Sequence, residues 1–280
     1  MAIVLALGAA AFYGAGDFVG GLATRRNAVL AVALGAQVSG LVALVVVMPF
    51  LGPATVRAGD LALGGAAGVF GGIGLVVVYR ALAAGPMSVV APTTALSASA
   101  VPVLAGLVMG ERPGLAAVAG IGVSFAAVAL ITREAPGDGV PSTGTAVRAL
   151  VPALGGGAIF GLFFVFLHHT GSDAGMWPLV AARLTSVPVL AALVVRRRVR
   201  VERTGRLLAA VVACGTLDMA ANVCYLLASR HGLLAVVAAI TGLYPASTVV
   251  LAQTRLGERM APVQLTGLGV AAVAALMVAS

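Results

Sequence analysis

Ten apolar runs follow one another along this chain and are joined by short polar connections. Most of them have about the 20 residues that a transmembrane helix needs to cross a bilayer. In lipid, only helices and closed β-barrels satisfy every backbone polar group, and these runs lack the alternation of barrel strands. The sequence therefore predicts an all-α integral membrane protein. The expected helices are residues 2–22, 29–50, 61–82, 89–109, 115–132, 150–167, 177–195, 207–227, 233–253 and 263–278.

The charge content supports a membrane location. Charged residues make up 9% of the sequence and hydrophobic residues 61%, whereas a soluble domain carries about 25% charged residues. In a soluble protein, the net charge of +8 would suggest nucleic acid as a partner. Here the basic residues cluster between the apolar runs, which indicates orientation in a membrane. No nucleic-acid partner is therefore expected.

The two halves of the chain are related by a constant offset of 147 positions. At this offset Gly110-Glu111-Arg112 falls on Gly257-Glu258-Arg259, and Tyr13 falls on Phe160. Because one offset holds in distant blocks, the sequence predicts two copies of one unit. We expect the first copy at residues 1–132, a polar Pro/Gly-rich linker at residues 133–147 and the second copy at residues 148–280.

Five apolar runs per copy is an odd number, so the second copy is expected to enter the membrane from the opposite side. The fold prediction is thus two inverted five-helix repeats. Inverted halves can rock about a site near the middle of the membrane and expose it to each side in turn. A duplication can also persist only because it folds, but the pattern favours transport.

Several segments resemble EamA-type units of the drug/metabolite transporter superfamily. In the first copy they are residues 79–86, Tyr-Arg-Ala-Leu-Ala-Ala-Gly-Pro, and Gly110-Glu111-Arg112. In the second copy they are Leu217-Asp218-x-x-Ala221-Asn222, Tyr225, Leu243-Tyr244-Pro245 and Leu256-Gly257-Glu258-Arg259. The resemblance covers nearly the whole chain and is weaker in the first copy, where Ser97-Ala98 stand at the Tyr-Pro positions. It implies a ten-helix secondary transporter, often an exporter of amino acids or other small metabolites, with a central cavity lined by both repeats.

Three charged residues, Asp17, Arg183 and Asp218, lie inside predicted helices and away from their ends. A charge at the centre of a membrane helix costs about 2.5–3.5 kcal/mol, so such residues are candidates for function. A buried pair between Arg183 and Asp218 would offset much of this cost. Three roles remain open: the pair locks two helices, Asp218 carries a proton, or Arg183 holds a substrate carboxylate. Asp17 faces either the membrane interface or a cavity.

Aromatic residues and a proline complete the candidate site. Tyr13, Phe160 and Tyr244 could stack on a substrate or simply pack helices together. Pro245 interrupts an apolar run and frees a backbone carbonyl, which predicts a cavity wall beside Tyr244. The candidate residues for substrate binding or coupling are Tyr13, Asp17, Phe160, Arg183, Asp218, Asn222, Tyr244 and Pro245.

Two further patterns are interpreted as structural. Gly64, Gly68 and Gly72 recur every four residues, as do Gly157 and Gly161, and this spacing lets membrane helices approach closely. Glu111 stands two residues before a proline at a tight corner. Its carboxylate is expected to meet the positive end of the next helix, which starts near residue 115.

Enzyme signatures such as H-E-x-x-H, G-x-S-x-G and the phosphate loop are missing from the sequence. We therefore expect no catalytic residues, no cofactor and no metal site. The sequence predicts a secondary transporter of the alternating-access type in the plasma or inner membrane. Its expected cargo is a small metabolite, an amino acid or an amphipathic compound, and export is the expected direction. Its expected partners are a small-molecule substrate, the lipid bilayer and protons as a candidate coupling ion. The alternatives are a membrane-embedded lipid-modifying enzyme and a non-transporting scaffold.

The arginines predict an orientation. Connections after the odd-numbered runs hold most of them, including the cluster in residues 196–206, whereas connections after the even-numbered runs hold Arg57, Arg112 and Arg230. By the positive-inside rule the odd-numbered connections are cytoplasmic and both termini are outside. The family resemblance implies the opposite, with both termini inside.

Overall fold

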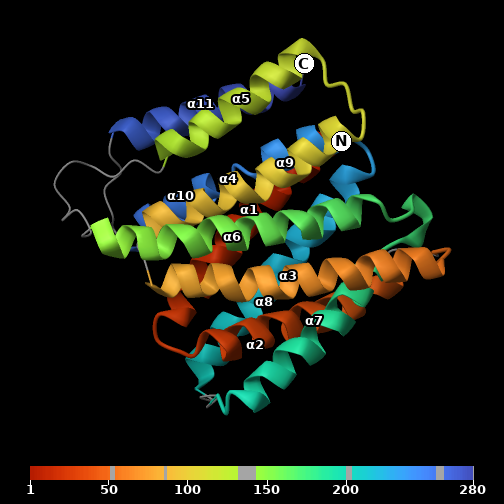
Figure 1. Ribbon diagram of the computed structural model, residues 1–280, viewed down its shortest axis with the longest axis vertical. Helices are drawn as coiled ribbons and strands as arrows, with labels where there is room; N and C mark the ends of the chain where they lie inside the picture. Colours follow the sequence, from red (N-terminus) through yellow and green to blue (C-terminus); the bar gives the residue numbers. More distant parts are fainter. Residues whose placement is uncertain (51–53, 85–86, 132–142, 200–203, 257–261, 280) are drawn as a thin grey trace.

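The computed structural model describes residues 1–50, 54–84, 87–131, 143–199, 204–256 and 262–279. All regular structure within these residues is helical, which confirms the all-α prediction (Figure 1). Short 3₁₀ turns lie at Met48–Phe50 and Ser172–Ala174. The α-helices are α1 (Ala2–Thr24), α2 (Val29–Val47), α3 (Ala58–Ala84), α4 (Met87–Val108), α5 (Leu115–Ile131), α6 (Thr143–His168), α7 (Trp177–Arg196), α8 (Gly205–Ser229), α9 (Leu234–Thr241), α10 (Pro245–Leu256) and α11 (Pro262–Ala279).

Two elements differ from the predicted runs. Helix α6 begins at Thr143, inside the expected linker, and residues 133–142 of that linker lie outside the described part of the chain. The ninth run, expected as one helix, is divided into α9 and α10. The division falls just before Pro245, because proline has no N–H to continue the helical hydrogen-bond pattern.

Six helices in the described part of the chain are long and apolar enough to cross a membrane. Four shorter apolar helical segments accompany them, at Thr93–Val108, Leu115–Leu130, Leu234–Thr248 and Pro262–Met277. Large apolar side chains face outward; Val46 and Leu208 are 63% and 66% exposed. A soluble surface rarely exposes so much apolar area, whereas a lipid-facing surface does. The chain is a multi-pass membrane protein.

Helix packing repeats itself between the two halves. Helix α1 packs on α8, and its counterpart α6 packs on α3. Likewise α2 packs on α8 while α7 packs on α3, and α6 packs on α4 while α1 packs on α9 and α10. The last helices of the two halves, α5 and α11, pack on each other and lie side by side at one end of the molecule (Figure 1). The most extensive helix contacts therefore join one half to the other.

The repeated glycines allow these helices to approach. A Cβ at Gly68 on α3 would overlap the backbone oxygen of Ala182 on α7, and one at Gly157 on α6 would overlap that of Thr94 on α4. Such overlap with backbone forces the helices apart. The predicted packing role of the two glycine patterns is confirmed at these contacts.

We expect Gly68→Ala to lower the free energy of unfolding by about 1–3 kcal/mol, the usual effect of overpacking. The matched control is Gly122→Ala on α5, where a Cβ would meet nothing within 4 Å. Thermal unfolding in detergent should show a lower midpoint for Gly68→Ala and an unchanged or higher one for Gly122→Ala. Equal midpoints would mean that α3 and α7 are not packed through Gly68.

Candidate functional site

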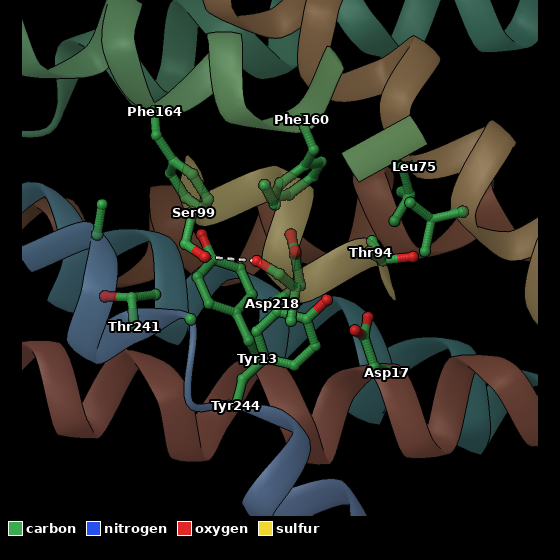
Figure 2. Close-up of a pocket in the computed structure, with 15 residues that line it drawn as sticks. Tyr13, Asp17, Leu75, Thr94, Ser99, Phe160, Phe164, Asp218, Thr241 and Tyr244 are labelled. Atoms are coloured by element: carbon green, nitrogen blue, oxygen red, sulfur yellow. Dashed lines mark hydrogen bonds between the residues drawn. The ribbon is translucent and has the colours of Figure 1, made fainter. Parts of the chain in front are cut away.

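A cavity of about 530 Å³, part of which is open to solvent, lies between the two halves. Helices α1, α3, α4, α6, α8 and α9 surround it, and the junction between α9 and α10 forms part of its wall (Figure 2). Most of the lining is apolar. The lining residues are Tyr13, Asp17, Leu75, Val78, Thr94, Ala95, Ala98, Ser99, Phe160, Phe164, Asp218, Ala238, Thr241, Gly242 and Tyr244.

Five of the eight predicted site residues therefore line one cavity, namely Tyr13, Asp17, Phe160, Asp218 and Tyr244. The other three lie just behind its wall. Asn222 and Arg183 are buried and contact Asp218. Pro245, also buried, is the first residue of α10 and follows the lining residue Tyr244.

The break between α9 and α10 shapes one side of the cavity. Three successive backbone bonds there join residues three apart, from Leu243 N–H to Ile240 O (3.0 Å), from Tyr244 N–H to Thr241 O (3.1 Å) and from Ala246 N–H to Leu243 O (2.9 Å). This tight turn carries Tyr244 inward, where its hydroxyl donates to the Ala91 carbonyl on α4 at 3.2 Å. The turn thus ties α10 to the opposite half.

A chain of polar side chains leads away from the cavity. The Tyr13 hydroxyl donates to Asn222 Oδ1 at 3.0 Å. Asn222 Nδ2 then donates to Asp218 Oδ2 at 3.1 Å, and Arg183 Nη2 forms an ion pair with the same oxygen. Arg183 Nη1 donates in turn to Gln37 Oε1. The chain joins helices α1, α8, α7 and α2 through the apolar interior.

This chain confirms that Arg183 and Asp218 are partners. It also shows that Arg183 is not among the cavity-lining residues, since it lies behind Asp218 and is 4% exposed. Its two terminal nitrogens are both engaged, and its Nε has no hydrogen-bond partner among the described residues. Burying an ion pair is favourable only with such additional hydrogen bonds, and Asn222 and Gln37 supply them.

Aromatic rings form the apolar side of the cavity. The Tyr13 ring meets Phe160 and Phe164 edge-on, with centroids 6.2 Å and 5.8 Å away. Behind them the centroid of Phe164 lies 4.2 Å from that of Tyr225. Edge-on contacts such as those of Tyr13 are a favourable geometry for aromatic pairs. The rings are therefore held in place and present a fixed apolar surface.

Two threonines in the cavity wall were not among the site residues predicted from the sequence. Thr94 on α4 and Thr241 on α9 are 3% and 2% exposed, and both line the cavity. Neither hydroxyl oxygen has a hydrogen-bond partner among the described residues. Buried hydroxyl groups are normally paired, so two unpaired ones in one cavity wall call for an explanation. They are 147 positions apart, and this offset is the signal that could have identified them.

The Glu111 carboxylate caps a different helix from the one expected. It was expected at the start of the following helix, but Oε1 accepts from the Leu234 N–H at 2.6 Å and Oε2 from the Ala235 N–H at 2.9 Å. Glu111 thus caps α9, a helix of the other half. The helix N-terminus offers free N–H groups and a positive dipole end to the carboxylate. Local spacing alone could not show that α9, rather than α5, supplies them.

We expect Glu111→Ala to destabilise the protein by about 1–2 kcal/mol, since it leaves two N–H groups of α9 without their acceptor. Glu111→Gln keeps one side-chain oxygen as an acceptor, so it should lower the stability of the protein less than Glu111→Ala does. Thermal unfolding of both variants in detergent measures the difference. Equal loss in the two would assign the effect to the charge rather than to capping.

No group of three or more His, Cys, Asp or Glu side chains that could hold a metal ion occurs in the part of the chain that the structure describes. Cys214 and Cys224 on α8 are free thiols. The groups that the cavity wall offers to a ligand are carboxylates, hydroxyl groups and aromatic rings.

These features define a polytopic, all-helical membrane protein built around a central cavity between two related halves. The model of the EamA-like transporter family matches residues 1–133 and again residues 147–280. The chain therefore belongs to the EamA-like transporter family, which confirms the resemblance found in the sequence.

The fold is also that of a solved structure. One crystal structure, described only as that of a protein, is similar with a TM-score of 0.79 at 16% sequence identity, covering 99% of this chain and 98% of its own. At that identity the likeness concerns the fold alone. No curated protein matches the chain significantly.

Proposed function

We propose that this protein is a secondary transporter that moves a small molecule across the cell membrane by alternating access. In this proposal the chain crosses the membrane ten times, in two inverted five-helix repeats at residues 1–132 and 148–280. Helices α9 and α10 together make one interrupted crossing. The central cavity is the substrate site, export is the expected direction, and protons are the candidate coupling ion.

The observation that carries the proposal is that both copies line the cavity with equivalent residues. At the 147-residue offset Tyr13 corresponds to Phe160 and Asp17 to Phe164, and all four line it. Thr94 and Thr241 form a further pair. A site at the interface of two repeats is where alternating-access transporters bind their substrate, because rocking of the halves opens it to either side.

The connections after the even-numbered runs support alternate crossing, because they meet one another at one end of the molecule. Asp60, at the start of α3, accepts from the Gly171 N–H at 2.7 Å. Arg230, after α8, donates to the Gly171 and Gly175 carbonyls at 3.2 Å and 2.7 Å. Glu111, in the connection after α4, caps α9, and α9 begins where the connection after α8 ends. Ten crossings would place all four connections on one side.

The interrupted crossing is a second support. Secondary transporters commonly form their sites from discontinuous helices, whose free backbone groups face substrate or ions. The α9–α10 junction is such a break, and Gly242 and Tyr244 within it line the cavity. Irregular backbone at membrane depth is tolerated where it is buried in protein or lines a cavity.

The test is counterflow in proteoliposomes, since accumulation of label driven by unlabelled substrate on the other side distinguishes a carrier from a channel. A panel of radiolabelled amino acids and amines serves as probes. Ala98→Phe fills the cavity, where Ala98 is 4% exposed, and should abolish counterflow. Its control, Val118→Phe on α5, replaces a side chain that is 50% exposed and should not. Equal activity of the two variants would refute the cavity as the transport site.

We expect the arginine-poor connections to face the outside. Ser172→Cys lies in one of them and Ala28→Cys in an arginine-rich one, and both positions are exposed. A membrane-impermeant thiol reagent on intact cells should label Ser172→Cys, and Ala28→Cys only after lysis. The wild-type chain, whose two cysteines lie within α8, gives the background. The reverse labelling pattern would place both termini inside.

A further inference from the structure

We propose that the cavity binds an amphipathic organic ammonium ion, with the charged nitrogen at Asp17 and the apolar body against Phe160 and Phe164. This inference rests on the proposed transport function, to which it adds the chemical class of the substrate. It arises from the charge, the hydrogen-bonding groups and the shape of the cavity wall.

Charge is the first argument. Among the lining residues that the structure describes, the carboxylic acids are Asp17 and Asp218, and none is an arginine, lysine or histidine. Arg183 already pairs with Asp218 from behind the wall. Asp17 forms no ion pair or hydrogen bond with any residue that the structure describes. A partly buried carboxylate is stabilised by a counter-charge, and a ligand cation in the cavity supplies it.

The remaining polar groups favour a ligand that donates hydrogen bonds. The hydroxyl hydrogens of Tyr13 and Tyr244 are directed to Asn222 and to the Ala91 carbonyl, which leaves their oxygens as acceptors. The unpaired hydroxyl groups of Thr94 and Thr241 have oxygens that can also accept. A protonated amine carries N–H donors and no acceptor, so it matches a wall of carboxylate and hydroxyl oxygens.

The carboxylate of Asp17 and the phenylalanine rings lie on opposite sides of the cavity. Figure 2 shows Phe160 and Phe164 on one side of the cavity and Asp17 on the opposite side. This asymmetry comes from divergence of the repeats, because Asp17 in the first copy corresponds to Phe164 in the second. A ligand with one charged end and one apolar or aromatic end fits both sides. Aromatic faces near the nitrogen add a cation–π contribution.

The same features disfavour an amino acid. The hydroxyl groups of Thr94 and Thr241 could donate to an α-carboxylate, but its charge would lack a cationic partner, because both terminal nitrogens of Arg183 are already bonded to Gln37 and Asp218. A carboxylate beside Asp17 and Asp218 would also be repelled. The cavity thus separates an amine from the corresponding amino acid, although amino acids are frequent substrates by family resemblance.

Three ligands of nearly equal size test this assignment. Radiolabelled 2-phenylethylammonium is bound to the purified full-length protein in a scintillation proximity assay. Unlabelled 2-phenylethanol, which lacks the charge, and L-phenylalanine, which adds a carboxylate, compete against it. We expect both competitors to bind at least about tenfold more weakly than unlabelled 2-phenylethylammonium, as for the loss of a charged hydrogen bond. Absent binding of the ammonium ion, or equal competition by the three, overturns the proposal.

Asp17→Asn keeps the size of the side chain and removes its charge. This variant should bind 2-phenylethylammonium at least about tenfold more weakly than the wild type does, whereas its affinity for 2-phenylethanol should be nearly unchanged. The control is Asp173→Asn, an exposed acid outside the cavity, which should bind the ammonium ion as the wild type does. A thermal unfolding midpoint like that of the wild type establishes that Asp17→Asn is folded. Undiminished affinity in folded Asp17→Asn overturns the assignment of the charged nitrogen to Asp17.

Counterflow separates this inference from the proposed function. Tight binding of 2-phenylethylammonium without counterflow would leave the ammonium site standing and refute transport. Counterflow of L-phenylalanine without binding of the ammonium ion would refute the ammonium site and leave transport standing.

Discussion

Replacing Arg183 with glutamine is expected to lower the free energy of unfolding by about 3–5 kcal/mol, the usual cost of removing one partner from a buried ion pair. Arg183 is 4% exposed, so the Asp218 carboxylate would remain in the interior without its counter-charge. Asn222 alone would continue to donate to that carboxylate. The replacement also removes one of two donors from α7 to Gln37 Oε1 on α2 and leaves the Ser186 hydroxyl as the other.

The double-mutant cycle tests whether the pair itself is responsible. Asp218→Asn should destabilise the protein similarly, because it leaves the guanidinium uncompensated. Arg183→Gln together with Asp218→Asn removes both charges and should recover most of the lost stability. Thermal or denaturant unfolding in detergent measures all four proteins. If the two losses simply add, the residues are not energetic partners in spite of their contact.

This ion pair was predictable because a charged side chain inside a membrane is costly unless an opposite charge pairs with it. Three charged residues lay inside predicted helices and away from their ends, and two of them, Arg183 and Asp218, carried opposite charges on neighbouring runs. Gln37 was not predictable in the same way. An amide costs less to bury than a charge, and its contact with Arg183 spans 146 positions of the sequence. No local pattern indicates a partner at that distance.

The repeat made part of the cavity predictable. Tyr13 and Phe160 correspond at the 147-residue offset; they were identified as aromatic residues that could stack on a substrate, and both line the cavity. Thr94 and Thr241 share that offset but are common residues in apolar runs, so type alone did not distinguish them. Their significance depends on burial and on the lack of partners, which only three-dimensional structure reveals.

Helix interruptions and caps were harder to predict. Proline at position 245 indicated a kink, but whether a helix bends or stops depends on what receives the freed backbone groups. Here the chain turns, and Ser247 and Thr248 then donate to the carbonyls of Ala10 and Gly14 on α1. The partner of Glu111 likewise belongs to the other half. Both outcomes depend on tertiary contacts between the copies.

Neutralising the ion pair is also expected to uncouple transport from a proton gradient. Asp218 lines the cavity, and its carboxylate joins the cavity to the buried polar chain of Arg183 and Asn222. Acidic residues in such positions serve as proton sites in many pumps and transporters. Asp218→Asn alone would confuse loss of coupling with misfolding, because it strands the Arg183 charge. The double variant Arg183→Gln, Asp218→Asn avoids this difficulty.

In proteoliposomes, this double variant should show no accumulation driven by a pH gradient, whereas counterflow at equal pH continues at close to the wild-type rate. Counterflow needs only the cavity and the rocking of the two halves, whereas accumulation also requires a group that binds and releases a proton on each cycle. The control Asp173→Asn removes an exposed carboxylate outside the cavity and should retain both activities. Gradient-driven accumulation of wild-type magnitude in the double variant would exclude Asp218 as the coupling residue. Loss of both activities in a folded double variant would instead show that the pair is needed for the conformational cycle itself.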